Sequence, residues 1–309
     1  MNLIWGPPGT GKTKTIGALL FALWKMKCRT LTCTPTNNAV VEVAARVVGL
    51  VTSSLEYDTY GIGDIVLFGN SERMKIGGFQ ELDQVFLEHR VSVLADCLSP
   101  TSGWRRKAES MIRILKFPKD EYSSYLNDVK EVPKNTKSKD NKLSFSEFVT
   151  KRFNVLEEQL TTMLRNLYTH MPTSFVTLQL AKKMIKVISL IRSIGVSITG
   201  NDGLGKELFQ LLEELLCQTV TFRKSTDYWE IGNFCLKTAS LIFCTASSSI
   251  NLHRKGEKSL EYLVIDEAAR VKECESLIPL QLGGLRHAVL VGDEKQLPAM
   301  VQSKVLYLS

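Results

Sequence analysis

Apolar residues along the 309-residue chain follow two periods, and the period changes along the sequence. Toward both ends, short apolar runs alternate with longer segments in which apolar residues recur every three or four positions. Runs of the first kind predict buried strands and segments of the second kind predict helices. The predicted strands cover 2–5, 29–33, 63–68, 241–245, 260–265 and 287–291. Alternation of strands and helices predicts an α/β fold with a parallel sheet covered on both faces.

The middle of the chain shows a helical period almost throughout, with the longest periodic stretches at 145–167, 176–194 and 204–216. A strand period is absent there, so this part of the chain contributes no strand to the predicted sheet. We therefore predict a discontinuous core that is interrupted by a mostly helical insertion. The predicted core covers 1–70 and 237–309, and the predicted insertion covers 71–236.

One segment of the insertion, 130–142, has five lysines, two acidic residues and almost no large apolar side chain. Such a segment cannot bury enough apolar surface to offset the entropy of ordering it, so we predict a disordered loop. Contact with phosphate groups is the alternative interpretation of its lysines.

Composition narrows the class of protein only slightly. The chain is 44% hydrophobic with a net charge of +7, which suits a globular protein and is compatible with a polyanionic partner. Its seven cysteines form no C-x-x-C pair, so neither a zinc site nor a disulfide framework is indicated. Neither a signal peptide nor an apolar run of 18 residues is present in the sequence, and we expect an intracellular protein without a membrane partner.

The strongest chemical signal lies directly after the first predicted strand. Glycines at 6, 9 and 11 precede Lys12 and Thr13, with the G-x-x-x-x-G-K-[ST] spacing of a phosphate-binding loop. The glycines allow backbone amides to approach phosphate oxygens, while Lys12 supplies charge and Thr13 supplies a hydroxyl for Mg²⁺. The predicted ATP-binding residues are Gly6, Pro7, Pro8, Gly9, Thr10, Gly11, Lys12 and Thr13.

A pair of carboxylates follows the predicted strand at 260–265. Asp266 at the end of a buried strand is placed to bind Mg²⁺, together with Thr13. Glu267 is then the candidate acceptor of a proton from the attacking water. The alternative is that the two acids only cap the helix that follows.

A third polar block, Gly292 to Pro298, follows the last predicted strand. It would place Asp293 and Gln296 at the carboxyl edge of the sheet, where ligands bind in open α/β folds. Gln296 can hydrogen-bond a γ-phosphate or the attacking water, and we include it among the catalytic candidates. A polar turn ended by Pro298 is the alternative.

These blocks, in this order, resemble the first motor domain of superfamily 1 helicases, in particular the senataxin-like group and its plant relatives. The resemblance rests on the phosphate-binding loop, on 34–40 (TPTNNAV), on 266–269 (DEAA) and on 292–298 (GDEKQLP). A weaker family block is similar to 243–247 (FCTAS).

The resemblance implies a RecA-like P-loop core and ATP-driven translocation on RNA or DNA with strand separation. It assigns hydrolysis to Asp266 and Glu267, and it makes Gln296 a sensor of the γ-phosphate. The insertion is similar in position to an accessory domain that touches nucleic acid. A nuclear location is expected more than a cytoplasmic one. The residues expected near single-stranded RNA or DNA are Pro35, Thr36, Asn37 and Thr245.

The sequence departs from the family in three respects. Arg270 stands where the family usually has Gln, and we expect it not to reach the γ-phosphate from the opposite side of the site. The family's adenine-reading segment and β-barrel, which would precede the P-loop, are not found in this sequence. The family's second motor domain with its further arginines, which would follow Ser303, is not found either. The expectation is a truncated motor domain that is weakly active alone, and the alternative is a nucleotide- or nucleic-acid-binding module that turns over poorly.

Overall fold

The computed structural model describes residues 1–7, 9–76, 80–131, 142–196, 202–218, 227–253, 259–293 and 295. Pro8, Gln296 and most of the lysine-rich segment at 130–142 lie outside these residues. The described residues form two compact units. One unit combines Met1–Val91 with Gly232–Ser309, and the other is Ser92–Ile231.

The first unit is built on a six-stranded sheet with the order β1-β6-β5-β2-β4-β3. Every neighbouring pair is parallel, as the sequence predicts. Parallel strands in this order require crossovers, which the intervening helices provide. The strands are β1 (Asn2–Trp5), β2 (Thr30–Thr34), β3 (Ile65–Leu67), β4 (Leu241–Thr245), β5 (Tyr262–Ile265) and β6 (His287–Gly292).

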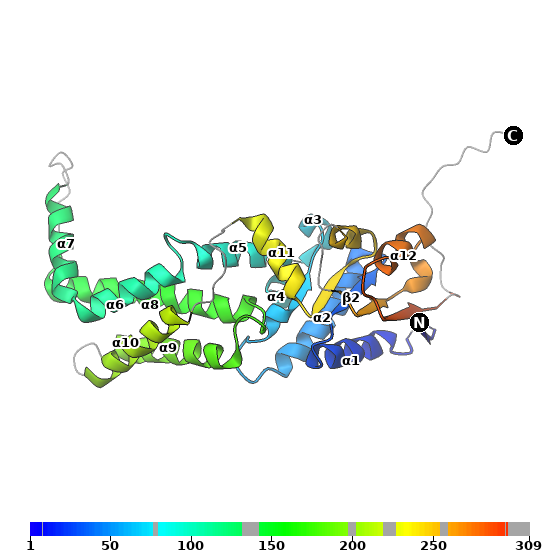
Figure 1. The fold of residues 1–309 in the computed structure, drawn as a ribbon, viewed down its shortest axis with the longest axis horizontal. Helices are drawn as coiled ribbons and strands as arrows, with labels where there is room; N and C mark the ends of the chain where they lie inside the picture. The colour runs from blue at the N-terminus through cyan, green and yellow to red at the C-terminus, as the bar shows by residue number, and fades with distance from the viewer. Residues whose placement is uncertain are drawn as a thin grey trace. The chain divides into compact units, whose positions relative to one another are not determined.

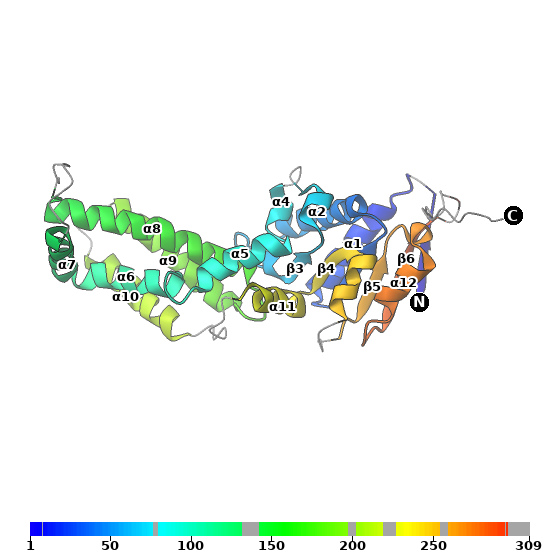
Figure 2. The ribbon, with the colours of Figure 1, turned by 90° about the horizontal axis from the view of Figure 1, so that it is seen from above.

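Helices cover both faces of this sheet, which confirms the predicted α/β class. The helices α1 (Lys12–Lys25) and α2 (Asn37–Ser53) lie on one face and α12 (Glu273–Leu280) lies on the other (Figures 1 and 2). All residues of β2 and β4 are buried, as expected for strands between two helical layers. The main apolar cluster joins α1 and α2 to the sheet through residues such as Leu20, Val47 and Phe243.

The first strand differs from its prediction. Sequence alone predicts a buried strand at 2–5, but β1 is an edge strand that pairs only with β6 among the described strands. Leu3 is 73% exposed and Trp5 is 58% exposed, whereas Ile4 packs against the core cluster. The prediction was wrong because strand order depends on long-range pairing, which an apolar run does not encode.

Short elements complete the first unit around the sheet. They are η1 (Ile62–Asp64), α3 (Ser71–Met74), α4 (Gln80–Asp83), η3 (Ser247–Leu252) and η4 (Ala268–Arg270). Both α3 and α4 pack on α2. The compact first unit therefore extends to Val91, beyond the predicted core boundary at residue 70. The functional division into a motor core and an accessory insertion at 71–236 stays a prediction.

All the secondary-structure elements that the structure describes in the second unit are helices. Its helix α6 (Trp104–Lys116) packs on α8 (Phe145–His170) and α10 (Asp202–Cys217), and α9 (Leu178–Val196) packs on α8 and α10. A further helix, α7 (Pro118–Glu131), packs on α6 and α8. Two helices, α5 (Leu87–Leu98) and α11 (Tyr228–Thr238), contain the boundaries between the units. Among the described residues, we find no helix with the length and apolar character that crossing a bilayer requires.

Candidate nucleotide site

The predicted phosphate-binding loop connects β1 to α1. Gly9 and Gly11 adopt φ values of 82° and 86°, in the left-handed region that glycine enters without strain. Gly11 is the N-cap of α1 and provides no side-chain cap, so the first helical turn opens directly onto the loop. The positive end of the α1 dipole and its first amides then face the place where an anion would sit.

Lys12 folds back over this loop. Its ammonium group donates to the carbonyl oxygen of Gly6 and, at 2.9 Å, to that of Pro7. Thr10 reinforces the turn through a 2.8 Å bond from its hydroxyl to the same Pro7 oxygen. The Lys12 charge therefore lies at the loop itself, where it can exchange carbonyl oxygens for phosphate oxygens.

A cavity of about 160 Å³ lies beside the loop. It brings together residues that are far apart in the sequence, since the loop follows β1 and Gly292 is the last residue of the neighbouring strand β6. The amide of Gly6 donates to the carbonyl oxygen of Gly292 at 3.4 Å. The cavity is lined by Lys12, Thr13, Asp266, Glu267, Ala269, Arg270, Gly292 and Asp293.

Two of the lining residues are the predicted carboxylates after β5. Asp266 is 7% exposed, and burial is the main factor that raises the pKa of its carboxyl group, while the bond from the Glu267 amide opposes that rise. Glu267 has a φ of 51°, an uncommon conformation for a residue with a side chain. This conformation turns the chain sharply into η4, and Glu267 makes no side-chain capping bond there. The helix-cap alternative therefore gains no support from the hydrogen bonds of Glu267.

The third polar block also reaches the cavity, through Asp293. This residue is buried, and its Oδ1 atom accepts a 3.0 Å bond from the amide of Lys295, as in a polar turn. Asp293 thus has the hydrogen bond of a polar turn and also lines the cavity, so its role in ligand binding stays a prediction. Gln296 lies outside the described residues, so its predicted contact with the γ-phosphate stays a prediction.

Gly292 allows η4 to lie close to the end of β6. A methyl group in place of its α-hydrogen would lie 3.2 Å from the backbone nitrogens of both Ala268 and Ala269. Backbone atoms cannot rotate away as a flexible side chain can. Glycine at the end of β6 therefore lets η4 approach the strand pair that carries the loop.

The structure places Arg270 in the wall of the same cavity, a position that sequence reasoning missed. Its Nη1 atom lies 2.9 Å from Oε2 of Glu267, and both side chains are partly exposed. In the sequence, Arg270 stands out only because the family usually has Gln at this position. The sequence could not show that Arg270 lies in the cavity wall, because that position depends on the sharp turn at Glu267.

The predicted nucleic-acid residues lie at the same carboxyl edge, at or directly after the ends of the neighbouring strands β2 and β4. Thr34 and Thr245 occupy paired positions at the ends of β2 and β4. Thr36 is exposed and caps α2 by accepting a 3.3 Å bond from Ala39. Thr245 is buried, and its hydroxyl bonds to that of Ser248 at 2.8 Å. The Thr245 side chain is therefore engaged internally, whereas Thr36 faces solvent.

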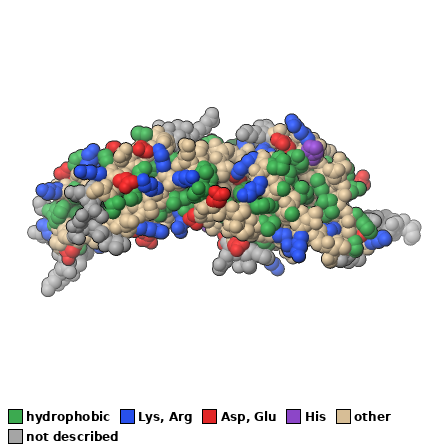
Figure 3. All heavy atoms as spheres, turned by 90° about the horizontal axis from the view of Figure 1, so that it is seen from below, with side chains coloured by type: hydrophobic (Ala, Val, Ile, Leu, Met, Phe, Trp, Pro, Cys, Tyr) green, Lys and Arg blue, Asp and Glu red, His purple; other side chains and the backbone are tan. Residues whose placement is uncertain are grey.

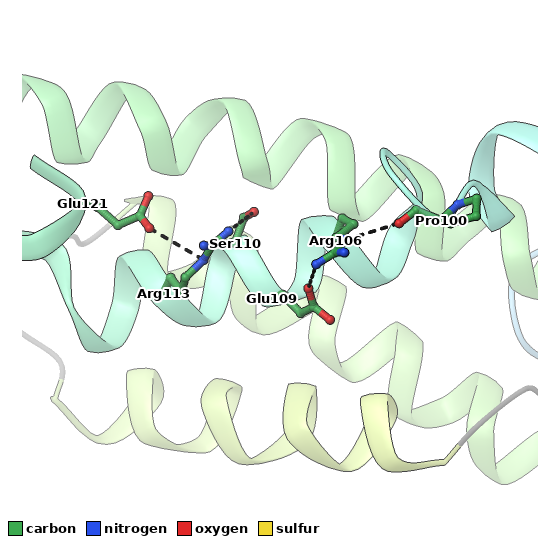
Figure 4. Close-up of polar contacts among 6 residues, drawn as sticks. All are labelled: Pro100, Arg106, Glu109, Ser110, Arg113 and Glu121. Atoms are coloured by element: carbon green, nitrogen blue, oxygen red, sulfur yellow. Dashed lines mark hydrogen bonds and ion pairs between the residues drawn. The ribbon is translucent and has the colours of Figure 1, made fainter. Parts of the chain in front are cut away.

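The helical unit carries many cations, but several are paired. On α6, Arg106 donates to Glu109 and to the Pro100 carbonyl, and Arg113 lies 3.6 Å from Glu121 (Figure 4). On the face drawn in Figure 3, the coloured Lys and Arg side chains are scattered among acidic and apolar ones. Net charge alone therefore does not identify a nucleic-acid surface on this unit.

Comparison with known proteins identifies the family. Residues 1–304 match the AAA domain family. Helicase sen1 of Schizosaccharomyces pombe is 26% identical over 331 aligned positions, covering 98% of this chain and 16% of that protein. Probable helicase MAGATAMA 3 of Arabidopsis thaliana is 41% identical over 81 residues, covering 26% of this chain and 10% of that protein.

A further relative is the DNA replication ATP-dependent helicase/nuclease DNA2 of Gallus gallus. It is 27% identical over 145 residues, covering 46% of this chain and 13% of that protein. The chain spans 16% or less of the length of these three relatives. Taken with the parallel sheet and the P-loop, the matches show that this chain belongs to the AAA domain family, as a senataxin-like superfamily 1 helicase domain.

Proposed function

We propose that this chain is the ATP-binding motor domain of a superfamily 1 RNA or DNA helicase, which couples ATP hydrolysis to translocation and unwinding. The single observation that supports this function most is the cavity that Lys12 and Thr13 share with Asp266 and Glu267. These pairs are more than 250 positions apart in sequence, and phosphoryl transfer needs both in one place.

The residues of the cavity divide the chemical task. Lys12 and the amides at the start of α1 bind the phosphates and compensate the negative charge that develops in the transition state. Glu267 orients the attacking water and accepts its proton. The buried position of Asp266 keeps its carboxylate in a fixed place.

Magnesium fits the donor set of this cavity. Thr13 offers a hydroxyl and Asp266 a carboxylate, which are hard oxygen ligands of the kind Mg²⁺ takes alongside substrate phosphates and water. Within the described residues, no cluster of three or more His, Cys, Asp or Glu side chains forms a site for a different metal. When bound, Mg²⁺ would compensate charge on the phosphate oxygens. Thr13 and Asp266 are the residues that would hold it.

The size of the cavity indicates which part of the nucleotide it takes. At about 160 Å³ it is smaller than the roughly 300–1,000 Å³ typical of sites for whole small molecules. We infer that it holds the terminal phosphates and the metal, while the nucleoside lies outside it. Adenine recognition would then depend on residues beyond the cavity wall.

Single-stranded RNA or DNA would bind beside this site. The segment Pro35 to Asn37 follows β2, which pairs with the strand that carries Asp266. We propose that nucleic acid contacts this segment and the neighbouring end of β4. Full activity would further need arginines from a second motor domain, as the resemblance implies. A nuclear, intracellular location accords with such a partner and stays a prediction.

A second candidate function, a module that binds nucleotide but turns over poorly, is favoured by one specific contact. The ion pair between Arg270 and Glu267 occupies an oxygen of the proposed base. A carboxylate held in this way is less available to the attacking water.

Single-turnover hydrolysis of labelled ATP distinguishes the two functions. The wild-type chain would be used in excess over ATP, with Mg²⁺ present. It would be compared with Glu267→Gln, with and without single-stranded RNA and DNA. A motor domain predicts slow hydrolysis that nucleic acid accelerates and that Glu267→Gln abolishes. Binding without stimulated or Glu267-dependent hydrolysis would support the module instead. Failure of the wild-type chain to bind ATP would overturn both.

A further inference from the structure

The position of Arg270 deepens the function proposed above and rests on it. We propose that Arg270 is an additional phosphate-binding residue, which contacts the terminal phosphate of a nucleoside triphosphate from the side of the Asp266–Glu267 turn. It thereby gives the site a preference for triphosphate over diphosphate.

The backbone aims Arg270 back toward the cavity. Glu267 adopts its left-handed conformation directly after β5, and the following turn η4 closes with a 2.9 Å bond from the Arg270 amide to the Glu267 carbonyl. The turn therefore reverses the chain within three residues. As a result, the Arg270 side chain lines the cavity that also contains Lys12 and Thr13.

The strand pair β1–β6 fixes the distance between this turn and the phosphate-binding loop. Gly292 is paired with Trp5, the last residue before the loop, and it has no side chain to hold η4 away. The loop thus follows β1, and the turn packs on β6, the strand paired with β1. Arg270 and Lys12 approach the cavity from two different elements with a common support.

The charges of the cavity require a second cation. Among the described residues that line it, the carboxylates of Asp266, Glu267 and Asp293 outnumber the positive charges of Lys12 and Arg270. A triphosphate entering such a cavity is repelled by the carboxylates that Mg²⁺ does not compensate. Arg270 offsets one of them through its ion pair with Glu267.

The guanidinium group can contact phosphate without leaving Glu267. Its bond to Glu267 uses Nη1, whereas the group has five N–H donors in a rigid fork. That geometry suits simultaneous contact with a carboxylate and a phosphate oxygen. A lysine ammonium group is a compact point charge without this fork, so it is less suited to contact the carboxylate and the phosphate oxygen at the same time.

The chain offers a close control for this proposal in Lys272. It lies two residues further along, and its side chain is 42% exposed like that of Arg270. Each of the two pairs with a glutamate three positions away, Arg270 with Glu267 and Lys272 with Glu275. Lys272 does not line the cavity. Removal of either charge changes the net charge equally, so only Arg270→Gln removes a cation from the site.

The experiment measures the affinities of a non-hydrolysable ATP analogue and of ADP, both with Mg²⁺, for wild type, Arg270→Gln, Arg270→Lys and Lys272→Gln. We expect Arg270→Gln to weaken analogue binding by at least about fivefold and ADP binding by less, since a partly exposed charged contact is screened by solvent. Arg270→Lys should recover part of the loss, and Lys272→Gln should bind both ligands like wild type.

Three results would overturn the proposal while leaving the proposed function intact. Equal analogue binding by wild type and Arg270→Gln would mean that Arg270 only holds Glu267. Equal losses in Arg270→Gln and Lys272→Gln would mean a general effect of charge. Equal losses for ADP and the analogue would place the contact away from the terminal phosphate. Absence of binding by wild type, in contrast, would remove the nucleotide site itself.

Discussion

The amide nitrogen of Asp266 donates a 2.9 Å hydrogen bond to the carbonyl oxygen of Cys33. Cys33 lies on β2, two residues before Pro35, so the candidate metal ligand is bonded to the strand that leads into the candidate nucleic-acid segment. The strand on the other side of β2, which is β4, makes a similar bond. The amide of Ala246, directly after β4, donates to the carbonyl oxygen of Thr34 at 3.0 Å. Nucleic acid that moved the end of β2 would therefore act directly on the backbone at Asp266.

Replacement of Lys12 is expected to remove most nucleotide affinity. Lys12→Ala deletes the cation at the loop and the bonds that Lys12 makes to the carbonyls of Gly6 and Pro7. A hydrogen bond to a charged group is worth about 1.5–3 kcal/mol, which is roughly 10- to 150-fold in affinity. Titration with a labelled ATP analogue and Mg²⁺ measures the loss. Lys14→Ala is the control, since Lys14 is exposed on the same helix and does not line the cavity. Equal binding by Lys12→Ala and wild type would contradict the P-loop assignment.

Hydrolysis by residues 1–309 alone is expected to be very slow, despite the presence of Asp266 and Glu267. Arginine donors that meet the transition-state charge contribute about 10³–10⁵ in rate in related phosphoryl-transfer enzymes. The resemblance places such arginines on a second motor domain, and Arg270 lies on the same turn as the carboxylates. Phosphate release and duplex unwinding, each measured with the purified chain, test this expectation. Unwinding by the purified chain with ATP and no partner would show it to be wrong.

The arginine at position 90 is expected to stabilise the first unit rather than to bind ligand. Arg90 is 1% exposed, and it donates to the carbonyl oxygens of Gly63, Ile62 and Gln84. Arg90→Met keeps much of the volume but leaves these buried oxygens without that donor, so we expect a loss of at least about 2 kcal/mol in the free energy of unfolding. Urea denaturation measures it. Arg73→Ala, at an exposed position, should change stability by less than about 0.5 kcal/mol.

The close approach at Gly292 predicts a specific defect. In Gly292→Ala the added methyl group would press on the backbone nitrogens of Ala268 and Ala269, at a cost of about 1–3 kcal/mol, and would displace η4 from the cavity. We expect lower thermal stability together with weaker ATP-analogue binding. Gly283 provides the control, because a methyl group there meets no atom within 4 Å. If Gly283→Ala and Gly292→Ala have the same thermal stability and the same ATP-analogue affinity, the close approach of η4 to Gly292 contributes to neither property.

Buried thiols predict a loss of stability at alkaline pH. Burial raises the pKa of Cys235 to about 11, although the neighbouring Arg90 opposes the rise. Above a pH of about 8.5, the unfolded chain releases this proton while the folded chain retains it, so the free energy of unfolding falls as the pH approaches 11. Cys235 contributes about 3 kcal/mol across this range. Urea denaturation at several pH values should give a shallower decline for Cys235→Ala than for wild type. An unchanged decline in Cys235→Ala would contradict the assignment, and Cys217→Ala is the exposed control.

Much of the fold could be predicted from the sequence because it depends on local patterns. All six predicted strands are present, and the spacing of the phosphate-binding loop correctly predicts a turn between a strand and a helix. The exposure of Trp5 could not be predicted, since it follows from the place of β1 in the strand order. Arg90 could not be recognised as buried either, because a charged residue in a helix usually lies at the surface.

The candidate site shows the same division. The spacing of residues identified Lys12, Thr13, Asp266 and Glu267 as candidates, and the structure brings them into one cavity. The sequence marks Arg270 only as a residue that is unusual at its position. Its approach to the cavity depends on the backbone conformation of the preceding turn, and propensity scales carry almost no information about single residues with positive φ.

The edge position of β1 has a consequence for ligand affinity. A strand held by one described neighbour, with Leu3 and Trp5 in solvent, gains less from burial than the interior strands do. Local fraying of such a strand competes with its docked form, and the loop is ready for phosphate only in the docked form. The apparent dissociation constant is then the intrinsic constant divided by the docked fraction. Any contact that seats β1 more firmly would thus tighten nucleotide binding without touching the nucleotide.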